Sequence, residues 1–168
     1  MENLFFHPEI VHIPIALAVL MPLLTAGLLL AWWQNWLPRR AWWIALSFQL
    51  ILVGSGYLAT ESGEKDEDVV ERIVDHDAIE AHEEAAETFM TAAIAVLIVF
   101  LAAGLIPKQS VAIAFGGLAL VGTLVVFGLG YQAGQAGGAL VYEHGAANAF
   151  IQAPSSPGTS PRGETEEH

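Results

Sequence analysis

The chain of 168 residues contains no cysteine. This absence excludes disulfides, thiolate metal sites, covalently attached c-type haem and cysteine-ligated iron–sulfur clusters. Histidine is therefore the main side chain that remains for binding a transition metal.

Positive charge is scarce as well, because six Lys and Arg residues stand against 18 Asp and Glu, for a net charge of −12. Twelve of the acids lie between residues 61 and 87, where Lys65 and Arg72 are the only basic residues. No basic stripe is available to neutralise phosphates, so we expect no nucleic-acid partner. No nucleophile–base pair or phosphate loop is found either, and we expect a carrier or binding subunit rather than an enzyme.

Apolar residues dominate the chain, with 54% hydrophobic and 14% charged residues, as in a small integral membrane protein. Four apolar runs come near the ~20 residues that a bilayer requires. They cover residues 10–33, 41–60, 85–106 and 111–138. The short links NWLPRR and PKQS join the runs in pairs. We predict an all-α fold over residues 1–151, a four-transmembrane-helix bundle made of two hairpins.

The few basic residues indicate how these spans are oriented. Arg39, Arg40 and Lys108 lie in the two short links, so the positive-inside rule places both links in the cytoplasm. Both termini are then expected outside the cytoplasmic (inner) membrane. All five tryptophans surround the first link, as expected of an aromatic belt at that interface. The first run follows no basic segment, and we expect it to be retained as a span rather than cleaved.

Two segments are too polar to span a bilayer. The acidic connection, residues 61–84, alternates acids with Val and Ile. This pattern predicts an amphipathic helix at the outer face, between the second and third spans, that runs into the third span. Residues 152–168 are rich in Pro, Ser, Gly and Glu, which predicts a disordered tail.

Five histidines are expected at the outer face. His7 and His12 open the first run, His76 and His82 precede the third, and His144 follows the fourth. On a helical wheel, the neighbours of His12 and of His82 are apolar, so both are predicted to point into the bundle. His76 instead falls on an acidic stripe. That stripe contains Glu80, Glu83 and Glu87.

Glycines recur at the same depth as these histidines. Gly130, Gly134 and Gly138 follow one face of the fourth run, and Gly54 and Gly56 lie near the end of the second. They indicate either close helix packing or backbone cleared for a flat macrocycle. The second alternative predicts haem b with imidazole axial ligands. Its preferred ligands are His12 and His82, with His144 and His7 as substitutes, and Gly54, Gly130 and Gly134 leave room for the ring.

A non-redox function is the alternative to this haem-binding electron-transfer subunit. The stripe of His76, Glu80, Glu83 and Glu87 carries ligands suited to a divalent metal. The outer-face histidines and acids could also serve an assembly partner, and the glycine-rich fourth span could support oligomerisation.

Three short motifs suggest a family. HPEIVHIPIAL at the first run, HEEAAE at the third and GGALVYEHG after the fourth resemble the bacterial membrane family catalogued as domain of unknown function 2231. The resemblance covers residues 5–148. It implies a four-helix membrane protein in a respiratory or redox setting, with a redox partner protein at the outer face. It also implies histidine positions at His7, His12, His82 and His144.

Overall fold

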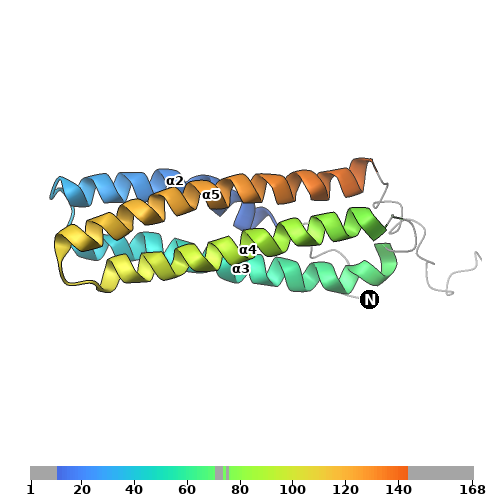
Figure 1. Cartoon of the computed structure of the whole chain (residues 1–168), viewed down its shortest axis with the longest axis horizontal. Helices are drawn as coiled ribbons and strands as arrows, with labels where there is room; N and C mark the ends of the chain where they lie inside the picture. Colours follow the sequence, from blue (N-terminus) through green and yellow to red (C-terminus); the bar gives the residue numbers. More distant parts are fainter. Residues whose placement is uncertain (1–10, 71–73, 75, 144–168) are drawn as a thin grey trace, which may run out of the picture.

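The computed structural model describes residues 11–70, 74 and 76–143, and of residues 64–70 the backbone alone. The described part is all-helical and contains no strand. Its elements are α2 (His12–Trp33), the short 3-10 helix η1 (Arg39–Ala41), α3 (Trp42–Val70), α4 (His76–Leu105) and α5 (Gln109–Tyr142). The four long helices lie along one common axis (Figure 1).

The four helices form a closed ring of neighbours. α2 packs on α3, α3 on α4, α4 on α5 and α5 on α2, so α2 lies diagonally across the bundle from α4. Arg39, Arg40 and Lys108 lie at the two short links, which we call the basic end. The opposite end, which we call the acidic end, carries the acids at the start of α4 and Glu143 after α5.

All four helices are long and apolar enough to cross a bilayer, which is consistent with a membrane protein. In each of the four most apolar windows only 28% of the residues are buried, so most apolar side chains face outward. α4 has 30 residues and α5 has 34. At a rise of ~1.5 Å per residue, both helices are longer than the ~30 Å thickness of a hydrocarbon core. A bilayer centred on the apolar windows therefore leaves the acidic turns of α4 outside the hydrocarbon.

The amphipathic helix expected over residues 61–84 and running into the third span is not confirmed as one helix in the described part of that segment. Instead α3 continues to Val70 and α4 already begins at His76. Glu and Lys are good helix formers, so leaving the hydrocarbon does not require a helix to end. The change in hydropathy marks the border of the apolar region and not the border of the helix.

From Phe89 onward on α4, and along α5, the buried residues recur at alternating intervals of three and four residues. On α4, after Ile79, they are Phe89, Ala93, Val96, Phe100 and Ala103; on α5 they are Ala112, Gly116, Ala119, Thr123 and Val126. This spacing is typical of left-handed helix bundles, in which neighbouring helices cross at about 20°.

Glycines of α5 receive large side chains of α4. A Cβ atom added at Gly122 would lie 2.5 Å from Cγ2 of Val96, and one at Gly130 would lie 3.1 Å from Cε2 of Phe89. Both side chains therefore pack directly on the α5 backbone. Small residues at such positions let two helices approach closely where no hydrophobic effect drives them together.

Two of the five tryptophans are core residues and not members of a belt. Trp32 and Trp42 are 4% and 2% exposed, and their ring centroids lie 5.8 Å apart. Trp42 stacks on Phe100 at 5.0 Å, and its Nε1 donates to the Phe100 carbonyl at 3.0 Å. A buried indole requires such a partner. The belt expectation is thus wrong for these two, whereas Trp33, Trp36 and Trp43 are exposed.

The turn after α2 is closed by backbone hydrogen bonds. Asn35 has φ 59°, a left-handed conformation that Asn tolerates better than most residues. The Trp36 N–H donates to the Ala31 carbonyl at 2.8 Å, and the Asn35 N–H donates to the Trp32 carbonyl at 3.0 Å. This pattern is a Schellman motif, which ends the helix and turns the chain toward α3.

Arg39 joins this turn to the second link. Its Nη2 donates to the carbonyls of Gly104, at 2.7 Å, and of Ile106. Its guanidinium also lies 5.9 Å from the centroid of the Trp32 ring. The last carbonyls of a helix lack partners within the helix, and a positive charge is favourable there. Arg39 therefore caps α4 from the link between α2 and α3.

We predict that Arg39→Ala lowers the free energy of unfolding by about 1–3 kcal/mol, because several charge-assisted hydrogen bonds are lost. Thermal unfolding in detergent measures the change. Arg40→Ala is the matched control, since Arg40 is exposed and exposed substitutions usually change stability by less than ~0.5 kcal/mol. Equal effects of the two substitutions would contradict a capping role.

Candidate functional site

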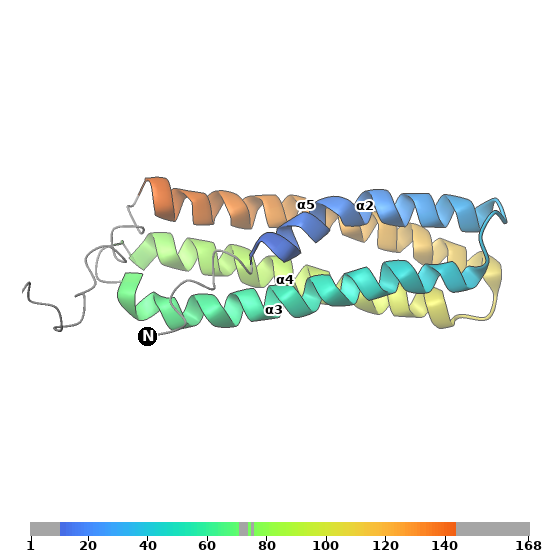
Figure 2. The same cartoon turned by 180° about the vertical axis from the view of Figure 1, so that it is seen from behind.

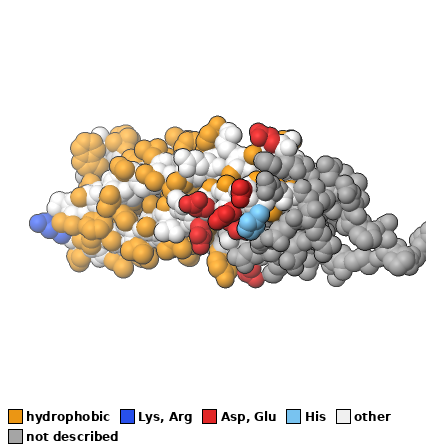
Figure 3. Space-filling view, turned by 45° about the vertical axis from the view of Figure 1, so that its right-hand side comes forward, with side chains coloured by type: hydrophobic (Ala, Val, Ile, Leu, Met, Phe, Trp, Pro, Cys, Tyr) orange, Lys and Arg blue, Asp and Glu red, His pale blue; other side chains and the backbone are white. Residues whose placement is uncertain are grey.

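The acidic stripe lies on the surface of α4. His76, Glu80, Glu83 and Glu87 are all exposed, as expected of a solvated face. Figure 3 shows acidic side chains gathered near a histidine at one end, with the Lys and Arg side chains at the other. Among the described residues no three His, Asp or Glu side chains come together to hold a metal ion. The stripe runs along the helix and does not converge on one point.

His82 lies at the interface between α4 and α5. It continues the seven-residue spacing of Val96 and Phe89, and it packs on a third glycine of α5. A Cβ atom added at Gly137 would lie 3.0 Å from Cε1 and 3.4 Å from Nδ1 of the His82 ring. The side chain is half-buried, and its Nδ1 atom is fully buried.

His12 does not share this location. It is exposed at the first turn of α2, as are Ile15, Ala16 and Val19 on the same face. The inward orientation expected of His12 is therefore not found. An apolar face of a helix need not be buried in the core of a bundle, so its composition does not show which way it points.

The axial pairing of His12 and His82 on one haem stays a prediction. His12 is exposed on α2, and His82 lies between α4 and α5, diagonally across the bundle. Two axial imidazoles must approach one iron from opposite sides. The fold offers His82 alone, among the described histidines, an interior position. His7 and His144, the other two candidates, lie outside the described residues, as does the tail 152–168.

The predicted glycines occupy different environments. Gly54 is exposed on α3 with open space around it, whereas the space beside Gly130 is filled by the Phe89 side chain. Gly134 has no atom within 4 Å of an added Cβ atom. Gly137, which contacts His82, was not among the candidates. The sequence feature that could have identified Gly137 is a shared spacing: Gly130 and Gly137 on α5 are seven residues apart, as are His82 and Phe89 on α4.

A groove opens between α2 and α5 at the acidic end, with a volume of about 470 Å³. α2 covers only part of α5, and its first turns lean away from α5 (Figure 2). Pro22 lies inside α2 and removes one helical hydrogen bond, which permits such a bend. The groove is lined by Ile15, Ala18, Val19, Phe127, Gly130, Tyr131, Gly134, Gln135, Gly138, Ala139, Tyr142 and Glu143.

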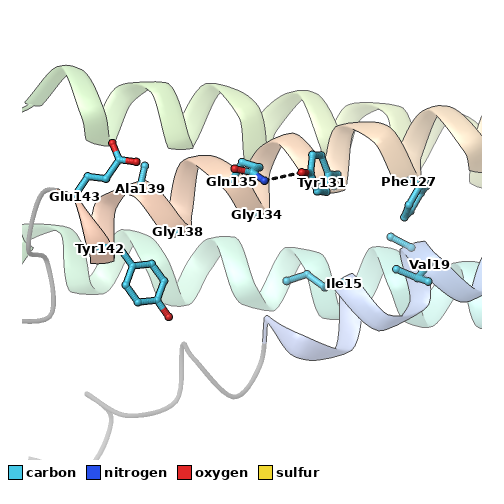
Figure 4. Close-up of a pocket in the computed structure, with 12 residues that line it drawn as sticks. Ile15, Val19, Phe127, Tyr131, Gly134, Gln135, Gly138, Ala139, Tyr142 and Glu143 are labelled. Carbon is cyan, nitrogen blue, oxygen red and sulfur yellow. Dashed lines mark hydrogen bonds between the residues drawn. The ribbon is translucent and has the colours of Figure 1, made fainter.

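The lining of the groove is apolar along its length and polar at its border. Ile15 and Val19 face Phe127 and the bare backbone at Gly134 and Gly138 (Figure 4). Gln135 Nε2 donates to the Tyr131 hydroxyl at 2.7 Å. Glu143 supplies a charge at the acidic end. Such a surface can receive an apolar helix that approaches closely at the glycines, and it carries no cluster suited to catalysis.

No family model, curated protein or solved structure matches this chain. The resemblance to domain of unknown function 2231 therefore stays a prediction.

We predict that His82 reacts with diethyl pyrocarbonate several-fold more slowly than the exposed His76, because α5 covers its ring. Gly137→Val should raise the rate at His82, since the added methyl groups would collide with the ring. Gly138→Val is the control, because a Cβ atom at Gly138 meets open space. Mass spectrometry of the modified peptides gives both rates. A His82 rate equal to that of His76 in the unsubstituted protein would contradict the placement of the ring.

Proposed function

We propose that this chain is a non-catalytic membrane subunit that binds a helix of a partner protein in the groove between α2 and α5. The observation that carries the proposal is the groove between α2 and α5, in which open space lies beside Gly134 and Gly138. Other glycines of α5, such as Gly122 and Gly130, contact side chains of α4. The groove thus exposes a small-residue surface of α5 on which no helix packs among the described residues.

The charge of the acidic end supports a basic partner. Glu143 lines the groove, and Glu80, Glu83 and Glu87 are exposed on α4. Complementary charge across an interface accelerates association and fixes the register. Two copies of this chain would instead bring two α5 helices and their Glu143 side chains to the same depth. We therefore propose an apolar partner helix with a Lys or Arg near the acidic end.

The proposed orientation places the basic end in the cytoplasm of a bacterial cell and the acidic end outside the inner membrane. Arg39, Arg40 and Lys108 support this orientation by the positive-inside rule. The groove then opens at the outer interface, where Tyr131 and Tyr142 are exposed. Tyrosine is favoured at that depth.

A photo-crosslinking amino acid at Gln135 should form one discrete adduct in native membranes. The same probe at Leu124, which is 53% exposed away from the groove, should not. Sequencing of the adduct should return an apolar helix with a flanking basic residue. Gly134→Leu should abolish the adduct by filling the groove. Gly128→Leu, also at an open position of α5, should leave it unchanged. Identical adducts from positions 135 and 124 would refute the proposal.

A haem-binding electron-transfer subunit is the second candidate. The observation in its favour is the interior position of the His82 imidazole, which packs on Gly137 between α4 and α5. Bound haem would supply one-electron transfer to a redox partner. Of the described residues, His82 would hold the iron. Its Nδ1 atom is buried by the protein itself.

An optical spectrum of protein purified from a haem-replete host tests this second candidate. Haem binding predicts a Soret band that His82→Ala removes or shifts to high spin, while His76→Ala leaves it unchanged because His76 is exposed. A spectrum without a Soret band, or an unchanged band in the His82 variant, would reject haem ligation by His82.

A further inference from the structure

Two polar atoms are buried in the middle of the bundle without a hydrogen-bond partner among the described residues. They are Oγ1 of Thr25 on α2 and Oε1 of Gln49 on α3. Both side chains are 0% exposed. An unsatisfied polar group in the interior of a membrane protein is costly, since no bulk water reaches it. The two atoms therefore require a hydrogen-bond partner.

The two residues lie at the same level on neighbouring helices. Thr25 precedes Trp32 by seven residues and Gln49 follows Trp42 by seven, and the two tryptophans contact each other. Seven residues are close to two helical turns, so Thr25 and Gln49 lie on the same faces as the tryptophans. Gln49 Nε2 donates to the Ala93 carbonyl at 3.0 Å, which fixes the amide with Oε1 as its remaining acceptor.

Other buried hydroxyls behave differently. Thr123 is 1% exposed, and its Oγ1 donates to the Leu120 carbonyl at 2.7 Å. Ser55 donates to the Leu52 carbonyl at 3.1 Å. Thr25 makes no such bond within its own helix. Its hydroxyl is a donor and the Gln49 oxygen is an acceptor, so their chemistry is complementary.

We propose that one buried water molecule bridges Thr25 and Gln49. The water accepts a hydrogen bond from Thr25 Oγ1 and donates one to Gln49 Oε1. Internal waters in proteins typically satisfy polar groups that have no other partner. The bridge connects α2 to α3 and, through the Gln49–Ala93 hydrogen bond, to α4. Thr25 lies between Pro22 and the basic end, where α2 packs on the bundle, and the bridge holds α2 there. This inference does not depend on the proposed function.

Water–protein NOE spectra of the full chain in nanodiscs test for the water directly. We expect cross-peaks to a long-lived water from the Gln49 side-chain amide and the Thr25 methyl, and none from the Thr123 methyl. If Thr25 and Gln49 show no such cross-peaks, the water bridge is refuted. This measurement uses the unsubstituted protein, so it does not depend on how well a variant folds.

A double-mutant cycle tests the coupling between the two side chains. Thr25→Val and Gln49→Leu should each lower the unfolding temperature by about 2–6 °C, and the double variant should lose little more than the larger single loss. Thr123→Val combined with Gln49→Leu is the control and should give additive losses. Additive losses for Thr25 and Gln49 as well would overturn the bridge.

Discussion

The close approach of α4 and α5 is the constraint on which the rest of the bundle depends. Val96, Phe89 and His82 pack at seven-residue intervals on Gly122, Gly130 and Gly137. Helices in a bilayer gain little from the hydrophobic effect and associate through packing and interhelical hydrogen bonds. The glycines allow that packing, and Arg39 of η1 and Trp42 of α3 add hydrogen bonds to carbonyls of α4. The pair of α4 and α5 is thus the frame against which α2 and α3 are placed.

The attachment of α2 to this frame is uneven. At the basic end Trp32 packs on Trp42 in the core, and farther toward the acidic end Ala18 still lies near Gly130. Toward the acidic end α2 leans away and begins only at His12, while α5 continues to Tyr142 (Figure 2). The groove is the result of this difference. It lies where four helices become three among the described residues, and that location motivates the assembly role.

The sequence predicted the helical class, the four apolar spans and the exposed acidic stripe, because hydropathy and helical periodicity report these features directly. It failed where orientation matters. The apolar surroundings of His12 predict a core face, but that face is exposed. The positions of Trp32 and Trp42 predict a belt, but both lie in the core. Lipid and core select the same residues. The continuation of α3 to Val70 was not predicted, because charged residues can extend a helix beyond the bilayer. Gly137 and the groove depend on the pairing of distant helices, which a single sequence does not report.

The absence of native cysteine makes one direct test of this arrangement available. The structure places the Ala18 Cβ atom 3.6 Å from a Cβ atom added at Gly130, within the range that a disulfide requires. The variant Ala18→Cys/Gly130→Cys should therefore oxidise readily to an intramolecular disulfide in membranes. Ala18→Cys/Gly128→Cys should not, because Gly128 faces open space. Failure of the first pair, or equal oxidation of both pairs, would contradict the packing of α2 on α5 from which the groove is derived.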